Sequence, residues 1–370
     1  MGHSLLFIPD ISGFTKFIQS TESEHSQHVI AELLEVLIAA NTLDLSLAEV
    51  EGDALFFYKE NEVPSAEMLL AQIENMFTAF YSHLKLLEEY RICPCNACAT
   101  APELNLKIIA HCGDLQFITV QNKRKPFGAE VIEVHRLLKN SIDSDNYVLI
   151  SEALAEGIGL NSQYTSQLFA FNPGSDHYDS RDVNYNYSEI NKSRLKLKPL
   201  QTAKKVNFTR KPDVYIKKQF QSEAHATLEY LSNFKYRRLW TKGLDSLDYH
   251  VNEVTRVGSE HRCVVNGSEL DFISIRKDVE PGQLSYGEYT DSVPLIDELY
   301  QFFIISPLTD NACNIEIEVY YKVSSLFKKV FMFFLGKFAL RKKVLESLDN
   351  LESFAKSYKI NPPAQKLPVS

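Results

Sequence analysis

Two aspartates in this sequence lie where the pattern predicts a strand end or a tight turn. Asp10 follows the apolar run at residues 5–8, which predicts a buried strand. Asp53 follows Gly52 at the turn of a predicted hairpin with arms at residues 43–47 and 54–58. A single aspartate in such a place is usually a turn or cap residue, but two together can hold Mg²⁺ or Mn²⁺. We therefore predict a metal site at Asp10 and Asp53.

Three cysteines form a second group that could bind metal. Cys93, Cys95 and Cys98 have the spacing Cys-x-Cys-x-x-Cys, and three thiolates can ligate Zn²⁺. The sequence offers His83, His111 or Cys112 as a fourth ligand. The alternative is a loop that contains small polarizable residues without a metal.

Composition limits the classes of protein that this chain can belong to. It has 370 residues, 45% of them hydrophobic and 24% charged, which predicts a folded protein with about two domains. The net charge of -9 argues against nucleic acid as the main ligand, because phosphate neutralisation needs a basic excess. We see no signal peptide and no long uncharged apolar stretch, and the six cysteines do not resemble a disulfide framework. We therefore expect a cytoplasmic protein.

The predicted elements of the first half alternate between strands and helices. After the first strand we expect a helix at 22–40, the hairpin, a helix at 66–90, strands at 104–110 and 115–120, a helix at 131–138 and a strand at 147–150. This βαββαββαβ order predicts a ferredoxin-like α+β core with an antiparallel sheet. Residues 191–211 contain many Lys and Arg residues and no acid, so we place a basic linker there, after a domain at 1–190.

The elements beyond the linker form a second domain, at 212–360. We expect a strand at 214–220, a helix at 224–233, alternating strands up to Tyr321, and a long helix at 324–358. This order resembles the helix-grip fold of the START-like (SRPBCC) superfamily, which implies a cavity for an apolar small molecule. The apolar residues of the long helix would then be core or cavity wall: Leu326, Phe327, Val330, Phe331, Phe334 and Phe338. The lysines and arginines of this helix also permit a membrane-surface role, but we favour solvated side chains and expect no membrane association.

Residues 7–15 (FIPDISGFT) and 49–53 (EVEGD) look like the first two signatures of class III adenylyl and guanylyl cyclases. A His-x-Gly strand end at 111–113 and a helix from Gly128 fall where later landmarks of that family lie. The resemblance implies a nucleotide cyclase domain that binds a nucleoside triphosphate with two Mg²⁺ or Mn²⁺ ions. It assigns Asp10, Ile11 and Asp53 to the metal site, and Gly13, Phe14 and Thr15 to the triphosphate, which free N–H groups at a helix start can bind.

The resemblance also implies a homodimer, in which the metal pair of one subunit faces base-reading residues of the other. Glu49 and Lys125 would read the base, as an acid and a base that suit guanine, unless both are exposed loop charges. Arg136 would stabilise charge on the transferring phosphate, but Ile132 stands where the family has an asparagine that orients the ribose. We therefore expect either a cyclase with a C-terminal ligand sensor or a catalytically degenerate homologue that acts as a nucleotide- or lipid-binding signalling module.

Overall fold

The computed structural model describes residues 3–21, 23–178, 181–200, 205–251 and 253–358. The chain divides into an N-terminal unit (Met1–Leu86 with Thr100–Pro199) and a C-terminal unit (Leu87–Ala99 with Leu200–Ser370). The division after Pro199 falls inside the predicted basic linker, of which residues 201–204 lie outside the described residues. Segment 87–99, which holds the three close cysteines, belongs to the C-terminal unit although it lies within the sequence predicted for the first domain.

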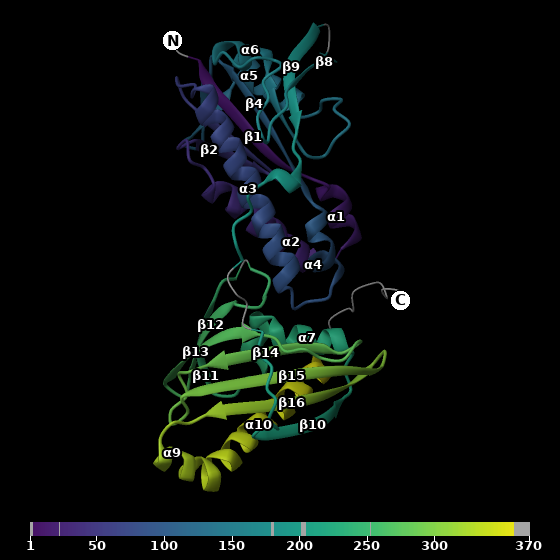
Figure 1. Cartoon of the computed structure of the whole chain (residues 1–370), viewed down its shortest axis with the longest axis vertical. Helices are drawn as coiled ribbons and strands as arrows, with labels where there is room; N and C mark the ends of the chain where they lie inside the picture. Colours follow the sequence, from purple (N-terminus) through teal and green to yellow (C-terminus); the bar gives the residue numbers. More distant parts are fainter. Residues whose placement is uncertain (1–2, 22, 179–180, 201–204, 252, 359–370) are drawn as a thin grey trace. The chain divides into compact units, whose positions relative to one another are not determined.

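The N-terminal unit is built on a seven-stranded sheet with the order β2-β3-β1-β4-β7-β9-β8 (Figure 1). Its strands are β1 (Ser4–Ser12), β2 (Ser46–Glu51), β3 (Ala54–Lys59), β4 (Asn105–Gly113), β7 (Tyr147–Ser151), β8 (Asn172–Tyr178) and β9 (Arg181–Glu189). All nine residues of β1 are buried, as expected for a central strand that is covered on both faces. Asp10 lies near the end of this buried strand, and Asp53 lies in the turn between β2 and β3.

Two features of this sheet differ from the prediction. Strands β4 and β7 pair in parallel, so the sheet is mixed and not purely antiparallel, since helix α5 (Ala129–Leu137) connects them as a crossover. Strands β5 (Gln116–Val120) and β6 (Lys123–Phe127) form a separate two-stranded sheet. The predicted strand at 115–120 is thus present, but it is part of a hairpin outside the main sheet.

The helices of the N-terminal unit follow their apolar periodicity. They are α1 (Phe14–Ser20), α2 (Ser23–Ala39), α3 (Ala66–Tyr90), α5 and α6 (Glu152–Gly157), with the short α4 (Asn96–Thr100) at the division between the units. The ends of α3 agree with the prediction, and its stripe from Leu69 to Phe80 is buried. Helix α5 packs Val134 and Leu137 against Leu6 and Ile8 of β1. This packing fixes α5 across the strand that carries Asp10.

The C-terminal unit is an antiparallel seven-stranded sheet with the order β10-β16-β15-β14-β13-β12-β11. Its strands are β10 (Val214–Phe220), β11 (Leu244–Tyr249), β12 (Glu260–Val265), β13 (Ser268–Ile275), β14 (Leu284–Thr290), β15 (Glu298–Thr309) and β16 (Ala312–Lys322). Helices α7 (Ala224–Ser232) and α8 (Arg237–Trp240) lie between β10 and β11 in the chain, and α10 (Lys337–Ser357) follows the meander. Phe220, Tyr286, Leu348 and Leu351 belong to one buried core that joins the sheet to α10.

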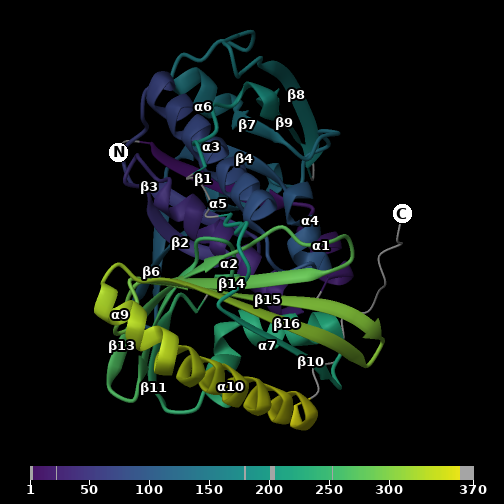
Figure 2. The ribbon, with the colours of Figure 1, turned by 60° about the horizontal axis from the view of Figure 1, so that its bottom comes forward.

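The last helical stretch corrects the prediction of a buried aromatic face. Helix α9 (Leu326–Phe331), a π-helical segment (Met332–Gly336) and α10 follow one another along an outer side of the unit (Figure 2). Of the six residues predicted as core or cavity wall, only Phe331 is partly buried, whereas Leu326, Phe327, Val330, Phe334 and Phe338 are exposed. The prediction was wrong because the core contacts come from other positions of the helix, including Met332 and Val344.

Candidate functional site

The hydrogen-bond register of the sheet brings Asp10 and Asp53 together. Strands β1 and β3 are antiparallel with Asp10 opposite Ala54, the residue after Asp53. The backbone N–H of Ile11 donates to the carbonyl oxygen of Asp53 at 3.1 Å. Gly52 makes the turn with φ of 70°, in the left-handed region that glycine adopts without strain. Asp10 and Asp53 thus lie at one end of the adjoining strands β1 and β3.

Electrostatics links the two carboxylates and a neighbouring lysine. Burial, and then the negative charge of Asp10, raise the pKa of Asp53 to about 6. The ammonium of Lys107, on β4 directly opposite Asp10, lies 3.0 Å from the Asp10 Oδ2. Burial alone would lower the pKa of Lys107, but the charge of Asp10 and the hydrogen bond to it raise it. The site is therefore one buried and one half-buried carboxylate with one lysine, and the sequence analysis did not find Lys107.

The residues predicted to bind the triphosphate lie directly beyond Asp10. Gly13 caps α1 with φ of 87°, Gly13 and Thr15 are exposed, and Phe14 is half-buried. The side chain of Ile11 is fully buried, so only its backbone carbonyl could serve as a ligand. Helix α1 has only seven residues, and its dipole is correspondingly limited.

The two predicted base-reading residues meet in the structure. The Lys125 ammonium, on β6, donates to the Glu49 Oε2, on β2, at 3.0 Å, and both side chains are well exposed. A second contact joins α5 to β2, because His135 Nε2 lies 3.0 Å from the Glu51 carboxylate. The acid and the base are therefore held as one accessible pair.

Helix α5 carries the two remaining residues of the predicted site. Ile132 is 55% exposed, so no packing role explains an apolar residue there. Arg136 is half-buried and lies four residues later, on the same face of the helix. A polar substrate that reaches this face would contact an arginine and an aliphatic side chain.

A buried hydrogen-bonded chain explains the His-x-Gly strand end. His111 Nδ1 lies 2.8 Å from the Ser151 hydroxyl, and His111 Nε2 lies 2.7 Å from the Glu130 carboxylate. A Cβ atom at Gly113 would overlap the Glu130 side chain, so glycine is needed for that approach. Although these are the residue types of a hydrolytic triad, Ser151 is buried and its hydroxyl also accepts from the Leu154 N–H. These hydrogen bonds therefore fix β4, β7 and α5 relative to one another. The buried Ser151 hydroxyl is not accessible as a nucleophile.

The three cysteines form a compact sulfur cluster. The sulfur atoms of Cys93, Cys95 and Cys98 all lie within 4.8 Å of one another. Hydrogen bonds with the other two sulfurs, followed by burial, raise the pKa of Cys98 well above its usual value. The segment is attached to the C-terminal unit, since the Val257 N–H donates to the Tyr90 carbonyl.

The residues suggested from sequence as a fourth zinc ligand have other environments. Both ring nitrogens of His111 are hydrogen-bonded, and His83 Nε2 lies 2.8 Å from a Glu32 carboxylate oxygen. Burial and the charge of Glu130 raise the pKa of Cys112 to about 11, which disfavours the thiolate. All three belong to the N-terminal unit. The cluster alone thus provides three sulfur ligands.

A buried ion pair in the C-terminal unit was missed from the sequence. Arg237 of α8 donates two hydrogen bonds to Glu288 of β14, at 2.7 and 2.8 Å, and both residues are buried. The Tyr286 hydroxyl also donates to Glu288, at 2.8 Å. No sequence signal separates these charges from solvated ones, because the residues are 51 positions apart.

Residues 30–147 match the model of a family described as "Protein of unknown function (DUF2652)". Over 127 residues the chain is 29% identical to "Uncharacterized protein Rv2561/Rv2562" of Mycobacterium tuberculosis, a match that covers 34% of this chain and 59% of that protein. The chain thus spans about three fifths of the length of this relative. Within the described residues, no helix is long and apolar enough to cross a membrane.

About half of the chain has structural neighbours among nucleotide cyclase domains. One is the catalytic core of a rhodopsin-guanylyl cyclase with converted specificity in complex with ATPalphaS, with a TM-score of 0.39, 14% identity, and coverage of 51% of this chain and 96% of that chain. Another is the adenylyl cyclase CyaB from P. aeruginosa, with a TM-score of 0.36, 16% identity, and coverage of 51% and 94%. The guanylyl cyclase Cya2 has a TM-score of 0.35, 13% identity, and coverage of 52% and 96%.

Proposed function

We propose that the N-terminal unit is a class III-type nucleotide cyclase domain, which binds a nucleoside triphosphate with divalent metal at Asp10 and Asp53 and forms a cyclic nucleotide. One observation carries this proposal: β1 pairs with β3 so that Asp10 lies opposite Ala54, the residue after Asp53, and the Ile11 N–H donates to the Asp53 carbonyl. Two acids this close oppose each other's ionisation, and a divalent cation removes that cost. Both lie next to the glycine turn that resembles the start of a triphosphate site.

The donor set fits Mg²⁺ or Mn²⁺. Both prefer oxygen ligands, which Asp10, Asp53 and the Ile11 carbonyl would provide. When bound, the metal would lower the pKa of the 3′-hydroxyl and neutralise charge on the α-phosphate.

The reaction needs little from the chain beyond positioning and charge. The ribose 3′-oxygen bonds to the α-phosphorus, the bond from that phosphorus to the β-phosphate oxygen breaks, pyrophosphate leaves, and the 3′-hydroxyl proton goes to solvent. Arg136 would stabilise the charge on the phosphate. Lys125 would donate to O6 of guanine while Glu49 accepts from N1–H and N2–H, so their mutual ion pair must open when the base enters.

A homodimer would bring the metal site of one subunit to the base-reading pair of the other. Large apolar side chains are exposed on β2, β5, β6 and α5, namely Leu47, Val50, Ile118, Val120, Phe127 and Ile132. The Lys125–Glu49 ion pair holds β6 to β2, and the His135–Glu51 contact holds α5 to β2, which groups these elements on one side of the unit. A patch of this kind supports a protein interface.

A second candidate function is nucleotide binding without turnover, and two observations favour it. Ile132 provides no hydrogen bond to orient a ribose, and loss of one such donor costs about 10²- to 10³-fold in rate in comparable sites. The Lys107 ammonium is already bound to Asp10, so a metal ion must compete with it. The domain would then act as a signalling module that responds to metal-nucleotide.

The test is incubation of the purified chain with Mn²⁺ and each of the four nucleoside triphosphates, followed by detection of cyclic product and pyrophosphate. Product that is lost in Asp10→Asn and Asp53→Asn but kept in Asp143→Asn supports the cyclase. Asp143 is the matched control because it is an exposed aspartate of the same unit. Absence of product from wild type and from Ile132→Asn, with nucleotide still bound, supports the second candidate.

We also propose that Cys93, Cys95 and Cys98 ligate a structural Zn²⁺. Tetrahedral sites have zinc–sulfur distances of about 2.3 Å, so three sulfurs already within 4.8 Å of one another need only small shifts. Protein purified without chelator should contain about one zinc, and cobalt substitution should give the visible absorption of a tetrahedral thiolate site. Metal content that is unchanged in the triple Ser variant of these cysteines would contradict the site, and Cys263→Ser is the control.

We assign the C-terminal unit to the helix-grip fold. The support is its element order: one strand, helices, a six-stranded meander and a long final helix. A sensor role for an apolar ligand stays a prediction, because most of the side chains proposed as cavity wall point to solvent.

A further inference from the structure

The helical stretch before the C-terminus carries an unusually apolar surface. The side chains that are exposed by 52–78% in residues 326–338 are Leu326, Phe327, Val330, Phe333, Phe334, Leu335 and Phe338. Single exposed apolar residues are common, but a continuous patch of this size marks an interaction surface. We name it the aromatic surface.

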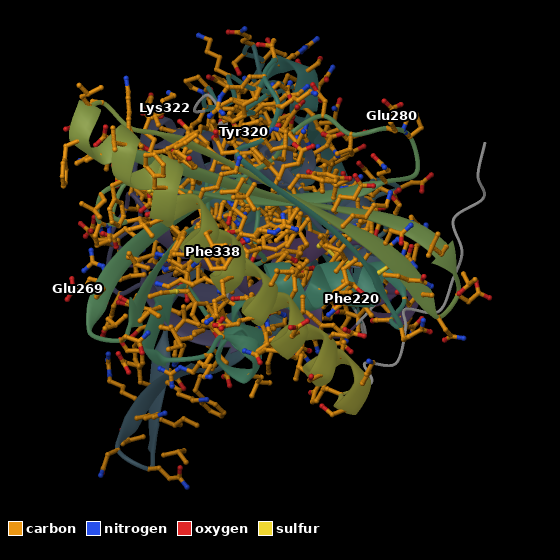
Figure 3. The ribbon with its side chains drawn as sticks, turned by 90° about the horizontal axis from the view of Figure 1, so that it is seen from below. Phe220, Glu269, Glu280, Tyr320, Lys322 and Phe338 are labelled. Atoms are coloured by element: carbon orange, nitrogen blue, oxygen red, sulfur yellow. The ribbon has the colours of Figure 1, made fainter. Side chains whose placement is uncertain are left out.

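One side of this stretch is anchored and the other side is open. Met332, Val344 and Leu348 pack into the core of the C-terminal unit. Phe327, Val330, Phe334 and Phe338 follow one another at intervals of three or four residues, so they lie along a single outward stripe. Figure 3 shows the unit from the side on which this helix faces the viewer, with Phe338 labelled on it.

The charges around the stripe have one sign. In a chain with net charge -9, residues 326–343 contain no acid and six basic residues, which are Lys328, Lys329, Lys337, Arg341, Lys342 and Lys343. Lys328 is paired with Asp297, and Arg341 donates to the Tyr215 carbonyl. For the other four, the described part of the chain provides no ion pair. They are placed to meet anionic groups of another molecule.

The apolar stripe and the basic side chains around it together indicate which kind of molecule binds this surface. A second copy seated on the same surface would bring together the four lysines of each copy that have no ion pair in the described part of the chain, eight like charges in all, which is costly. A bilayer with anionic lipid supplies both an apolar interior for the aromatic rings and negative headgroups for the lysines, whose long side chains can reach outward from the stripe. The stretch is too short and too charged to span the bilayer, so the helix would lie in the plane of the interface.

We propose that residues 326–343 bind the surface of an anionic lipid bilayer, with Phe327, Phe334 and Phe338 entering the acyl boundary and the lysines contacting headgroups. The sequence analysis favoured solvated lysines and expected no membrane association, and it separately predicted most of these rings to be core or cavity wall. The rings are exposed beside those lysines, and this combination supports the surface role.

The experiment is co-sedimentation of the full chain with vesicles of phosphatidylcholine alone or with 30% phosphatidylglycerol. Binding should require the anionic lipid and weaken with salt. Lys342→Ala with Lys343→Ala should lower the partition coefficient about twenty-five-fold, at about fivefold for each charge. Phe334→Asp with Phe338→Asp should abolish binding, whereas Leu308→Asp, at an exposed residue of β15, should not change it.

Insertion of the helix into the bilayer can be measured without those variants. Phe338→Trp introduces an indole on the stripe, and the natural Trp240 is buried. Lipids brominated on their acyl chains should quench the new fluorescence upon binding. Equal binding to neutral and anionic vesicles, no quenching, or a self-associated species that the aspartate substitutions dissociate without any vesicle binding would each overturn the proposal.

Discussion

Replacement of Asp53 by asparagine should stabilise the metal-free protein while it removes metal binding. In the folded state the pKa of Asp53 is raised from 3.8 to about 6 by burial and by Asp10. The folded state therefore holds a proton that the unfolded state releases, and stability falls as the pH rises from about 4 to about 6. Above that window the ionised carboxylate is a constant cost, which the neutral amide of Asp53→Asn does not carry.

The size of this change in stability follows from the pKa shift of Asp53. About two pKa units correspond to a ceiling of about 3 kcal/mol, and because the side chain is only half-buried, solvent screening reduces this to about 1 kcal/mol. A unit of this size should then gain about 2–4 °C in Tm. Thermal unfolding of wild type, Asp53→Asn and the control Asp143→Asn at pH 4 and pH 8, with chelator, measures the difference, which should appear only at pH 8.

Mn²⁺ with nucleotide should make wild type more stable than Asp53→Asn. Wild type gains about 2.7 kcal/mol when metal-nucleotide is present at a hundred times its Kd, and Asp53→Asn gains nothing. A variant that is less stable than wild type at pH 8 without metal would refute the reasoning, since it would make the carboxylate a structural hydrogen-bond acceptor.

Three further predictions concern packing and assembly. Burial opposes ionisation of Glu288, but the charge of Arg237 outweighs it and lowers the pKa, so this contribution to stability is present at neutral pH and is lost as acid protonates the folded carboxyl. Glu288→Gln should therefore lower the free energy of unfolding in urea by about 3–5 kcal/mol. Glu288→Leu combined with Arg237→Met should recover most of this loss. An equal loss in the single and the double variant would contradict the prediction. Gly113→Ala should displace Glu130 from His111 and lower stability by about 1 kcal/mol, whereas Gly157→Ala, with open space around it, should be neutral or stabilising. Val50→Asp should shift the sedimentation of the chain from dimer to monomer, and the equally exposed Met68→Asp on α3 should not; unchanged sedimentation of both would count against the proposed interface.

Strong local patterns predicted the elements well. The ends of α3 and β10 agree with the sequence prediction because each has a clear apolar period bounded by polar residues. Strand β6 was missed because its sequence, Lys-Arg-Lys-Pro-Phe, has no apolar alternation and contains a proline. Its pairing with β5 is a tertiary choice that propensity does not encode.

The site residues show the same division between local and long-range information. The turn at Gly52 and the strand end at Asp10 are local signals, whereas the expectation that the two carboxylates adjoin came from the resemblance to cyclases, because it depends on the pairing of β1 with β3. Lys107 could not be found, because it lies opposite Asp10 only through the pairing of β1 with β4, 97 positions apart in the chain. The aromatic surface was misplaced since apolar residues usually face a core, and only the fold shows which positions of the helix do so.

Calorimetric titration of Mn²⁺ with a nucleoside triphosphate into wild type, Asp10→Asn and Asp53→Asn tests the central claim most directly. We predict binding to wild type with release of protons near pH 6, because metal lowers the raised pKa of Asp53. We predict no binding to either asparagine variant, although both remain folded. Normal binding of metal-nucleotide to Asp10→Asn, or none to wild type with all four nucleotides, would contradict the account.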